Sequence, residues 1–251
     1  MATTDASIVF NVVYPLKCPL KKAACPRKGG VVDSSGMDIQ CIVTGAFQEN
    51  AYLVFDGAGK TAVVDPGEDA PRLLAALRDA GAELAAVLLT HGHLDHIAAL
   101  PAMLAAASVP VRIAAADAAW CFTERNSFFP YEPVLAPPET LAADLAEGTE
   151  VRAGNLVFRV LATPGHSPGS VCFLLEGSPG SPAALFSGDT LFAGSIGRTD
   201  YEGGDDAAMA SSLRRLAALP PETRVLPGHG PATTIARELR VNPYLLAAAA
   251  H

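Results

Sequence analysis

The stretch from His91 to His96, which reads HGHLDH, concentrates side chains that could bind a metal ion. Its candidate ligands are spaced closely enough for one strand-to-helix turn to bring them together; they are His91, His93, Asp95 and His96. Neutral imidazole and carboxylate groups are ligands that zinc and similar metals accept. A lone histidine is most often a structural residue, whereas several imidazoles beside a carboxylate on one turn predict a metal site.

Three more ligand-type side chains follow later in the chain, each after an apolar run and beside glycine. They are His166 in TPGHSPG, Asp189 in SGDT and His229 in PGHG. Any one of them alone could be an ordinary structural residue, but together they place five of the six histidines at predicted strand ends. Glycine at such positions lets the backbone approach a bound group closely. We therefore expect all three to join the HGHLDH stretch at one site.

The candidate ligands, five histidines and two aspartates, outnumber the three or four that one tetrahedral metal needs. Seven ligands suit two divalent ions about 3.5–4 Å apart, with a shared carboxylate and a bridging oxygen. Two such ions would lower the pKa of a bridging water, make a hydroxide nucleophile and polarise a substrate carbonyl. The residues therefore predict metal-assisted hydrolysis, with zinc as the expected metal and iron or manganese as alternatives.

The elements that must position these ligands can be predicted from the surrounding apolar patterns. Short β-branched and apolar runs between glycine turns predict strands at Ile39–Thr44, Ala51–Phe55, Thr61–Asp65, Ala85–Thr90, Val111–Ala114, Leu156–Leu161, Val171–Leu175, Ala183–Ser187 and Arg224–Leu226. Helical spacing predicts helices at Pro71–Ala80, Leu94–Ala107, Ala115–Phe122, Asp206–Leu219 and Ile235–Leu246. Strands that begin as hairpins and later alternate with helices predict helix-covered sheets, in an α/β or α+β layering. The proline-rich residues 130–138 predict a loop near the site.

Composition and charge exclude several classes of protein. Half of the 251 residues are hydrophobic, and no apolar run approaches the roughly 18 residues of a membrane span. The net charge of −8 argues against nucleic acid as a partner. The five cysteines do not form a paired framework, so we expect a reducing compartment and a cytoplasmic protein.

Residues 1–36 differ in charge from the rest of the chain and are expected to form an N-terminal basic extension, with a boundary near 34–37. They contain five basic and two acidic side chains, a net charge of +3. A partner-binding arm, a metal or redox pair of Cys18 and Cys25, and a transit sequence are all compatible with this composition. We favour a loosely packed tail, or an added edge strand at Ile8–Tyr14, because chain termini are usually weakly ordered.

The motifs THGHLDH, TPGHSPGS, GDTLF and PGHGP together resemble those of the metallo-β-lactamase superfamily. Within it the chain is most similar to the glyoxalase II-like group, the hydroxyacylglutathione hydrolases and their smaller relatives, from about Ile39 to Leu246. The resemblance implies that residues 37–251 form a four-layer αββα sandwich, with the site at the strand ends of one edge.

The same resemblance assigns roles to the candidate ligands. It places His91, His93 and His166 on one metal and Asp95, His96 and His229 on the other, with Asp189 bridging both. In the mechanism that we expect, Asp95 also has a catalytic role, since its carboxylate would hold the attacking hydroxide by a hydrogen bond. Asp65 would support the ligands from behind; the alternative is an ordinary turn residue before Pro66.

The substrate implied by the resemblance is a small thioester, for example one like S-lactoylglutathione. In full-length glyoxalase II a C-terminal helical domain holds glutathione, and here only 251 − 229 = 22 residues follow His229. We therefore expect that domain to be missing or reduced to one helix. Arg198 and Tyr201 are the remaining candidate substrate contacts, with ordinary loop packing as the alternative.

Other activities of this superfamily remain open from the sequence. The stretch GRTD at 197–200 also resembles persulfide dioxygenases of the same fold, which hold one iron through residues matching His91, His166 and Asp189. Hydrolysis of β-lactams stays open, and the acidic core argues against a nuclease. The oligomeric state is undetermined, with a homo-oligomer among the options.

Overall fold

The computed structural model describes residues 38–127, 134–177 and 181–250. The basic extension over residues 1–36 lies outside the described residues, as do residues 130–133 of the proline-rich loop. Within the described ranges no helix combines the length and the apolarity needed to cross a membrane.

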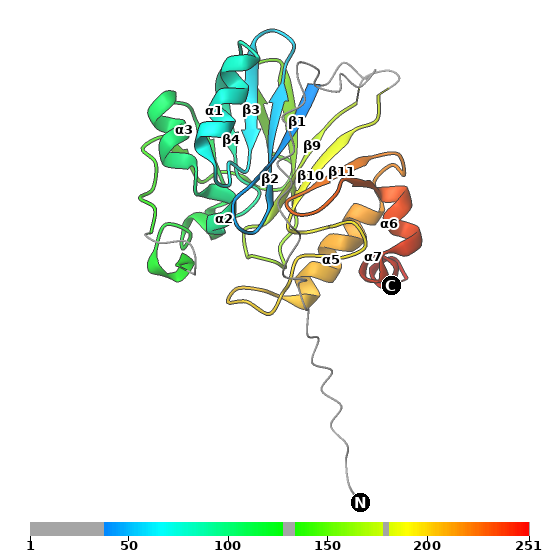
Figure 1. The fold of residues 1–251 in the computed structure, drawn as a ribbon. Coiled ribbons are helices and arrows are strands. Elements are labelled where there is room, and N and C mark those ends of the chain that lie inside the picture. Colours follow the sequence, from blue (N-terminus) through cyan, green and yellow to red (C-terminus); the bar gives the residue numbers. More distant parts are fainter. Residues whose placement is uncertain (1–37, 128–133, 178–180, 251) are drawn as a thin grey trace, which may run out of the picture.

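Two six-stranded sheets form the centre of the described structure (Figure 1). The first has the order β1-β2-β3-β4-β5-β6, with strands β1 (Asp38–Thr44), β2 (Glu49–Phe55), β3 (Lys60–Val64), β4 (Glu83–Leu88), β5 (Val111–Arg112) and β6 (Leu141–Ala142). The second has the order β12-β11-β10-β9-β8-β7, with strands β7 (Glu150–Ala153), β8 (Leu156–Ala162), β9 (Val171–Leu175), β10 (Ala184–Gly188), β11 (Arg224–Pro227) and β12 (Thr233–Thr234).

Helices cover the outer faces of both sheets (Figure 1). The first sheet carries α1 (Ala70–Asp79), α2 (Leu94–Ile97), α3 (Leu100–Ala106) and α4 (Ala115–Ala118), and the second carries α5 (Asp206–Ala217), α6 (Ile235–Val241) and α7 (Pro243–Ala249). A short 3-10 helix spans Glu124–Asn126.

Side chains of successive strand residues explain this layering, because they point to opposite faces of a sheet. In β2, Tyr52 faces the other sheet, where its ring meets Phe186 of β10 at a centroid distance of 5.4 Å. The next residue, Leu53, packs on the outer face with Leu73 of α1. A strand buried on both faces needs a covering layer on each side, so the expected αββα sandwich is confirmed.

Strand β7 was not expected from the sequence. Its four residues alternate between exposed and buried positions and include the charged Glu150 and Arg152, so no apolar run marks it. It pairs with β8 through the turn at Gly154–Asn155. The two-residue strands β6 and β12 were also unexpected, and the expected helix at Ala115–Phe122 is helical only over Ala115–Ala118.

The single helix expected at Leu94–Ala107 is wrong: the chain forms α2 and α3 with a break between them. At the break, the amide of Ala99 donates to the carbonyls of Pro66 and Gly67, at 3.1 and 2.6 Å, instead of continuing the helix. Pro101 then occupies the first turn of α3, where its missing N–H costs nothing. The break lets the turn after β3 pack directly on the HGHLDH segment.

The helix expected at Ile235–Leu246 is likewise divided into α6 and α7. Pro243 cannot continue a helix, because it lacks an amide hydrogen and its ring clashes with the preceding turn. Asn242 instead caps α7, with its side-chain oxygen accepting from the amides of Tyr244 and Leu245.

The strand directions decide where the candidate ligands meet. Strands β3 and β4 are parallel, and so are β10 and β11. Strands β8 and β10 are each antiparallel to β9, so they run in the same direction. Parallel strands present their carboxyl ends at the same edge, which places the segments after β3, β4, β8, β10 and β11 together.

Candidate metal centre

The segment after β4 brings most of the expected ligands together at the edge between the two sheets. His91 and His96 are buried, with exposed fractions of 1% and 0%, and Asp95 lies in the first turn of α2. His93 precedes that helix in extended backbone. The strand-turn-helix change of direction is what turns all four side chains toward one space.

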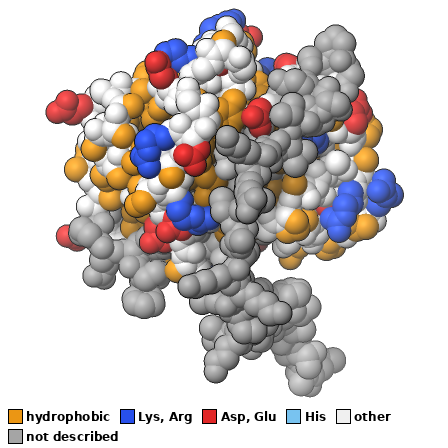
Figure 2. Space-filling view, turned by 45° about the horizontal axis from the view of Figure 1, so that its top comes forward, with side chains coloured by type: hydrophobic (Ala, Val, Ile, Leu, Met, Phe, Trp, Pro, Cys, Tyr) orange, Lys and Arg blue, Asp and Glu red, His pale blue; other side chains and the backbone are white. Residues whose placement is uncertain are grey.

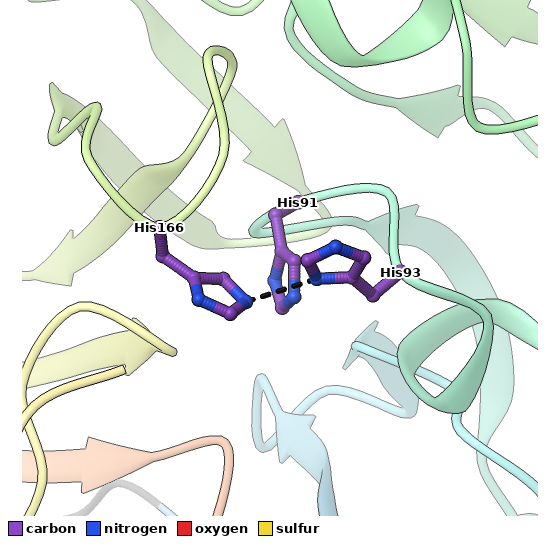
Figure 3. Close-up of side chains that lie close together, drawn as sticks. All are labelled: His91, His93 and His166. Atoms are coloured by element: carbon purple, nitrogen blue, oxygen red, sulfur yellow. Dashed lines mark hydrogen bonds between the residues drawn. The ribbon is translucent and has the colours of Figure 1, made fainter. Parts of the chain in front are cut away.

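His91, His93 and His166 form one group whose ring nitrogens lie within 4.8 Å of one another. Figure 3 shows the three rings converging, although His166 comes from the segment after β8 and the other two from the segment after β4. Nδ1 of His93 and Nε2 of His166 are 2.9 Å apart. Nitrogens at such a separation can share one metal ion, because a zinc–nitrogen bond is about 2.0–2.1 Å long.

Asp95, His96 and His229 form a second group within the same 4.8 Å limit. Oδ2 of Asp95 lies 3.3 Å from Nε2 of His229 and 3.8 Å from Nε2 of His96. The three side chains come from α2 and from the segment after β11.

Asp189, directly after β10, lies between the two groups. One of its oxygens is 3.4 Å from Nε2 of His96. The other is 3.6 Å from Nε2 of His166 and 3.6 Å from Nε2 of His229. The carboxylate therefore faces nitrogens of both groups, as a bridging ligand must.

The backbone around the site sets which ring nitrogen of two histidines faces inward. Nδ1 of His166 donates to the carbonyl of Arg198 at 2.8 Å, and Nδ1 of His229 donates to the carbonyl of Phe47 at 3.1 Å. A carbonyl can only accept, so each Nδ1 carries the hydrogen and each Nε2 presents a lone pair to the site.

Asp65 lies behind the site, in contact with His96 and with Thr90, the residue that pairs with His91. Its carboxylate accepts from the amide of Thr90 at 2.7 Å, from the Thr90 hydroxyl at 2.6 Å and from Nδ1 of His96 at 3.1 Å. Because that hydroxyl donates to Asp65, it accepts from Nδ1 of His91 at 3.0 Å. Asp65 is also a turn residue with a φ of 48°. The supporting role and the turn role, which the sequence offered as alternatives, are therefore compatible.

Three buried polar atoms at the site have no hydrogen-bond partner among the described residues: Nε2 of His91, Nε2 of His96 and Oδ1 of Asp189. An unsatisfied buried polar atom typically costs about 1–3 kcal/mol. Three such atoms converging from different segments would gain a partner from a divalent cation, since imidazole nitrogen and carboxylate oxygen suit zinc, iron and manganese. The donor set therefore fits a metal centre.

The pKa values of these groups favour the protonation states that bind metals. Burial and the neighbouring imidazoles lower the pKa of His93 to about 4 and hold that of His91 well below its ordinary value. Burial would raise the pKa of Asp189, but His229 and His96 hold it well below its usual range. The imidazoles are then neutral and the carboxylate ionised near pH 7, as metal ligation requires.

His96 and His229 behave differently, because they face the carboxylates. Burial lowers the pKa of His96, but Asp95 and Asp189 outweigh it and raise that pKa well above its ordinary value. For His229, Asp189 and Asp95 likewise outweigh burial and raise the pKa. A cation between these groups would displace the protons, so metal binding here should release protons.

Gly228 shows how tightly the segment after β11 fits against the site. A Cβ atom at this position would lie 2.4 Å from Oδ1 of Asp189 and 2.6 Å from Cε1 of His96. Any other residue would push the His229 segment away from the ligands.

Residues of β2 hold the His229 segment in place, and the sequence analysis did not identify them. The side-chain amide of Asn50 donates to the carbonyls of Pro227 and Gly230, at 2.9 and 2.8 Å, and the Tyr52 hydroxyl donates to Pro227 at 2.7 Å. The partners are more than 170 residues apart in the chain, so no local pattern could have found them.

The structure places Arg198 and Tyr201 beside the two groups rather than within them. The Tyr201 ring is 5.9 Å from the ring of His93 and 6.4 Å from that of His166. The Arg198 guanidinium lies 3.9 Å from the centre of the Tyr201 ring and makes two 2.6 Å hydrogen bonds to Asp200. Both side chains are about half exposed, which suits the rim of a site.

The profile of the metallo-β-lactamase superfamily matches residues 44–229, and the chain belongs to this superfamily. Its proteins bind divalent metals and include metal-dependent hydrolases. The ligand segments described above fall within the matched range.

The chain is similar to a curated hydrolase and to proteins of solved structure. The chain is 34% identical to the hydroxyacylglutathione hydrolase GloC of Haemophilus influenzae, over 83% of this chain and 98% of that protein. A crystal structure of TTHA1623 in a di-iron-bound form is similar at 41% identity and a TM-score of 0.71, covering 82% of this chain and 99% of that one. The crystal structure of ETHE1 from Myxococcus xanthus is similar at 30% identity and a TM-score of 0.66, covering 82% and 83%.

Proposed function

We propose that this protein hydrolyses a small thioester at a centre of two divalent metal ions. His91, His93 and His166 would hold one ion, and Asp95, His96 and His229 the other, with Asp189 shared. The observation that carries the proposal is the position of Asp189, within 3.6 Å of nitrogens from both groups. Zinc is the expected metal, with iron or manganese as alternatives.

When bound, the two ions would lower the pKa of a water molecule and polarise the thioester carbonyl. Asp95 is the candidate for orienting that water, because a carboxylate accepts through two oxygens and Oδ2 is the one recorded near His229 and His96. The oxygen of water forms a bond to the carbonyl carbon, the C–S bond breaks, and the thiolate leaves and takes up a proton. The products are a carboxylic acid and a thiol.

Arg198 and Tyr201 are the proposed substrate contacts. The guanidinium fork suits a carboxylate, and Asp200 occupies it in this structure. A thioester whose carrier has carboxylates, such as glutathione, could take the place of Asp200. The relatives named hydroxyacylglutathione hydrolase support a substrate like S-lactoylglutathione, at 34% identity in the case of GloC.

The remaining expectations about partners and location are also proposals. Acidic and basic side chains are interspersed where Figure 2 shows the described residues, so this visible part offers nucleic acid no continuous basic surface. The described cysteines, Cys41, Cys121 and Cys172, are free thiols, as a cytoplasmic location would require. We propose a small-molecule substrate without a membrane partner, and we leave a homo-oligomer as an option for measurement.

Metal content combined with a substrate panel tests the proposal. Purified protein would be analysed for bound metals and assayed against S-lactoylglutathione, a coenzyme A thioester, a β-lactam and glutathione persulfide. We expect two metal ions per chain and thioester hydrolysis exceeding every other activity. A protein with two ions that hydrolyses only the β-lactam would refute the thioester assignment and leave the metal centre intact.

An iron-dependent persulfide dioxygenase is the second candidate. His91, His166 and Asp189 would supply two imidazoles and a carboxylate, a set typical of iron oxygenases. The similarity to the ETHE1 structure supports this candidate. The di-iron TTHA1623 structure supports iron as a metal, but as two ions rather than one. An oxygen electrode separates the two: oxygen uptake with glutathione persulfide and one iron per chain would replace the hydrolase proposal.

A further inference from the structure

Asp117 is a completely buried carboxylate that accepts four hydrogen bonds close to the candidate metal centre. It lies in α4, within the alanine-rich segment AAADAAW. Oδ1 accepts from the amide of Gly169 at 2.7 Å and from the indole of Trp120 at 3.2 Å. Oδ2 accepts from the hydroxyl of Ser167 at 2.7 Å and from the amide of Gly92 at 2.9 Å.

The donors to Asp117 come from the two segments that carry the first group of ligands. Gly92 lies between His91 and His93, and Ser167 follows His166 directly in the chain. One carboxylate therefore connects the segment after β4 to the segment after β8. These are also the segments whose histidine nitrogens approach to 2.9 Å (Figure 3).

The fit around Asp117 leaves little room for adjustment. A Cβ atom on Gly169 would lie 2.7 Å from the Asp117 amide nitrogen and 2.7 Å from its Oδ1. The Ser167 hydroxyl is also 2.7 Å from that of Ser170, so its single hydrogen can go to Asp117 while it accepts from Ser170. Trp120, besides donating to Asp117, packs its ring 5.3 Å from the ring of His93.

We propose that Asp117 is a positioning residue that sets the separation of His93 and His166, and thereby the metal affinity of the group they form with His91. It acts through Gly92, Ser167 and Trp120, since the four hydrogen bonds that its carboxylate accepts come from these residues and from Gly169. The inference rests on the proposed metal centre, but not on the identity of the substrate.

Asp117→Asn is the informative variant, because it keeps the shape and replaces one acceptor oxygen by a donor group. Four donors converge on this side chain, so the new amide hydrogens face groups that can only donate in the present arrangement. Substituting a residue that positions metal ligands through hydrogen bonds typically lowers the metal affinity about 10- to 100-fold. We expect a loss in this range for the ion held by His91, His93 and His166. The affinity for the other ion should change less than about threefold.

The test is a competition titration of the purified protein with zinc against a chelator, followed by metal analysis and by tryptophan emission. Trp120 is the single tryptophan of the chain, so its emission reports on this position alone. The wild type should show an emission change as the ion of the His91, His93 and His166 group binds, because Trp120 lies beside His93. Asp117→Asn should shift that change to higher zinc concentration. Ser167→Ala, which removes one of the four donors, should shift it in the same direction by a smaller factor.

Asp56→Asn is the control, since Asp56 is another carboxylate held by backbone amides, those of Ala58, Lys60 and Asn155, but it lies at a turn of the first sheet. It should leave both zinc affinities unchanged. Unchanged zinc affinities in Asp117→Asn, or an equal loss in Asp56→Asn, would overturn the positioning role. A wild type that binds no zinc would instead refute the proposed metal centre, and the inference with it.

Discussion

Replacing Asp65 by asparagine should weaken metal binding at the site without disturbing the backbone. Asp65 has a φ of 48°, a conformation that asparagine adopts about as readily as aspartate. The amide oxygen can still accept from the Thr90 amide, as Oδ1 of Asp65 does at 2.7 Å. The change is therefore confined to Oδ2, which accepts from the Thr90 hydroxyl and from His96.

At that position the new amide group can only donate, so the hydrogens of its neighbours must move. Nδ1 of His96 would have to accept, which transfers the ring hydrogen to Nε2, the nitrogen that faces Asp95 and Asp189. A protonated Nε2 cannot bind a metal ion. The Thr90 hydroxyl would then accept from the amide and donate to Nδ1 of His91, so the same exchange affects a second ligand.

The expected size of the effect follows from the lost hydrogen bonds. Hydrogen bonds to a charged group contribute about 1.5–3 kcal/mol each. Part of this is recovered when the hydroxyl turns, so we expect a net loss of about 1.4–2.7 kcal/mol, or 10- to 100-fold in metal affinity. The ion held by Asp95, His96 and His229 should lose more affinity than the other ion.

Chelator competition with metal analysis measures this loss directly. Asp69→Asn is the matched control, because Asp69 also has a positive φ, 54°, but is exposed and pairs with Arg72. It should keep wild-type affinities. Two ions bound to Asp65→Asn with wild-type affinity would refute the assignment of Asp65 as the group that fixes the hydrogen on His96.

Four further outcomes are expected. Asp189→Ala should lose metal and activity together, and an active, metal-free variant would contradict the shared-ligand assignment. Removing metal by chelation should abolish activity and lower the melting temperature, and added zinc should restore both; unchanged melting would argue against a bound ion. Arg198→Ala should raise KM about two- to fivefold, a size typical of an exposed ionic contact, with kcat nearly unchanged, as initial rates would show; an equal fall in kcat would count against a binding role. For Glu238, burial would raise the pKa, but hydrogen bonds from Thr233, Gly194 and Asn242 lower it. Its contribution to stability is therefore present above the ordinary glutamate value of about 4.3 and is lost as pH falls through the lower folded value. Urea unfolding below about pH 4.3 should be less pH-dependent in Glu238→Gln than in the wild type, and identical slopes would refute this.

Local patterns in the sequence predicted most of the strands and helices and the residues of the candidate site. The apolar runs predicted the long strands because side chains in them alternate between two buried faces, as Tyr52 and Leu53 do. They failed where a strand was short and charged, as at Glu150–Ala153, and where a proline or a distant carbonyl divided a helix.

By itself, the sequence determined which residues could act as ligands, because HGHLDH and the glycine-flanked His166, Asp189 and His229 are readable from type and spacing alone. Only the tertiary structure decided which atoms face one another and what holds them there. Asp117 and Asn50 occur in no metal-ligand pattern, yet each connects segments distant in the chain. The reason is that a buried polar group takes its hydrogen-bond partners from whatever the folded sheets bring alongside it, and local sequence does not contain that information.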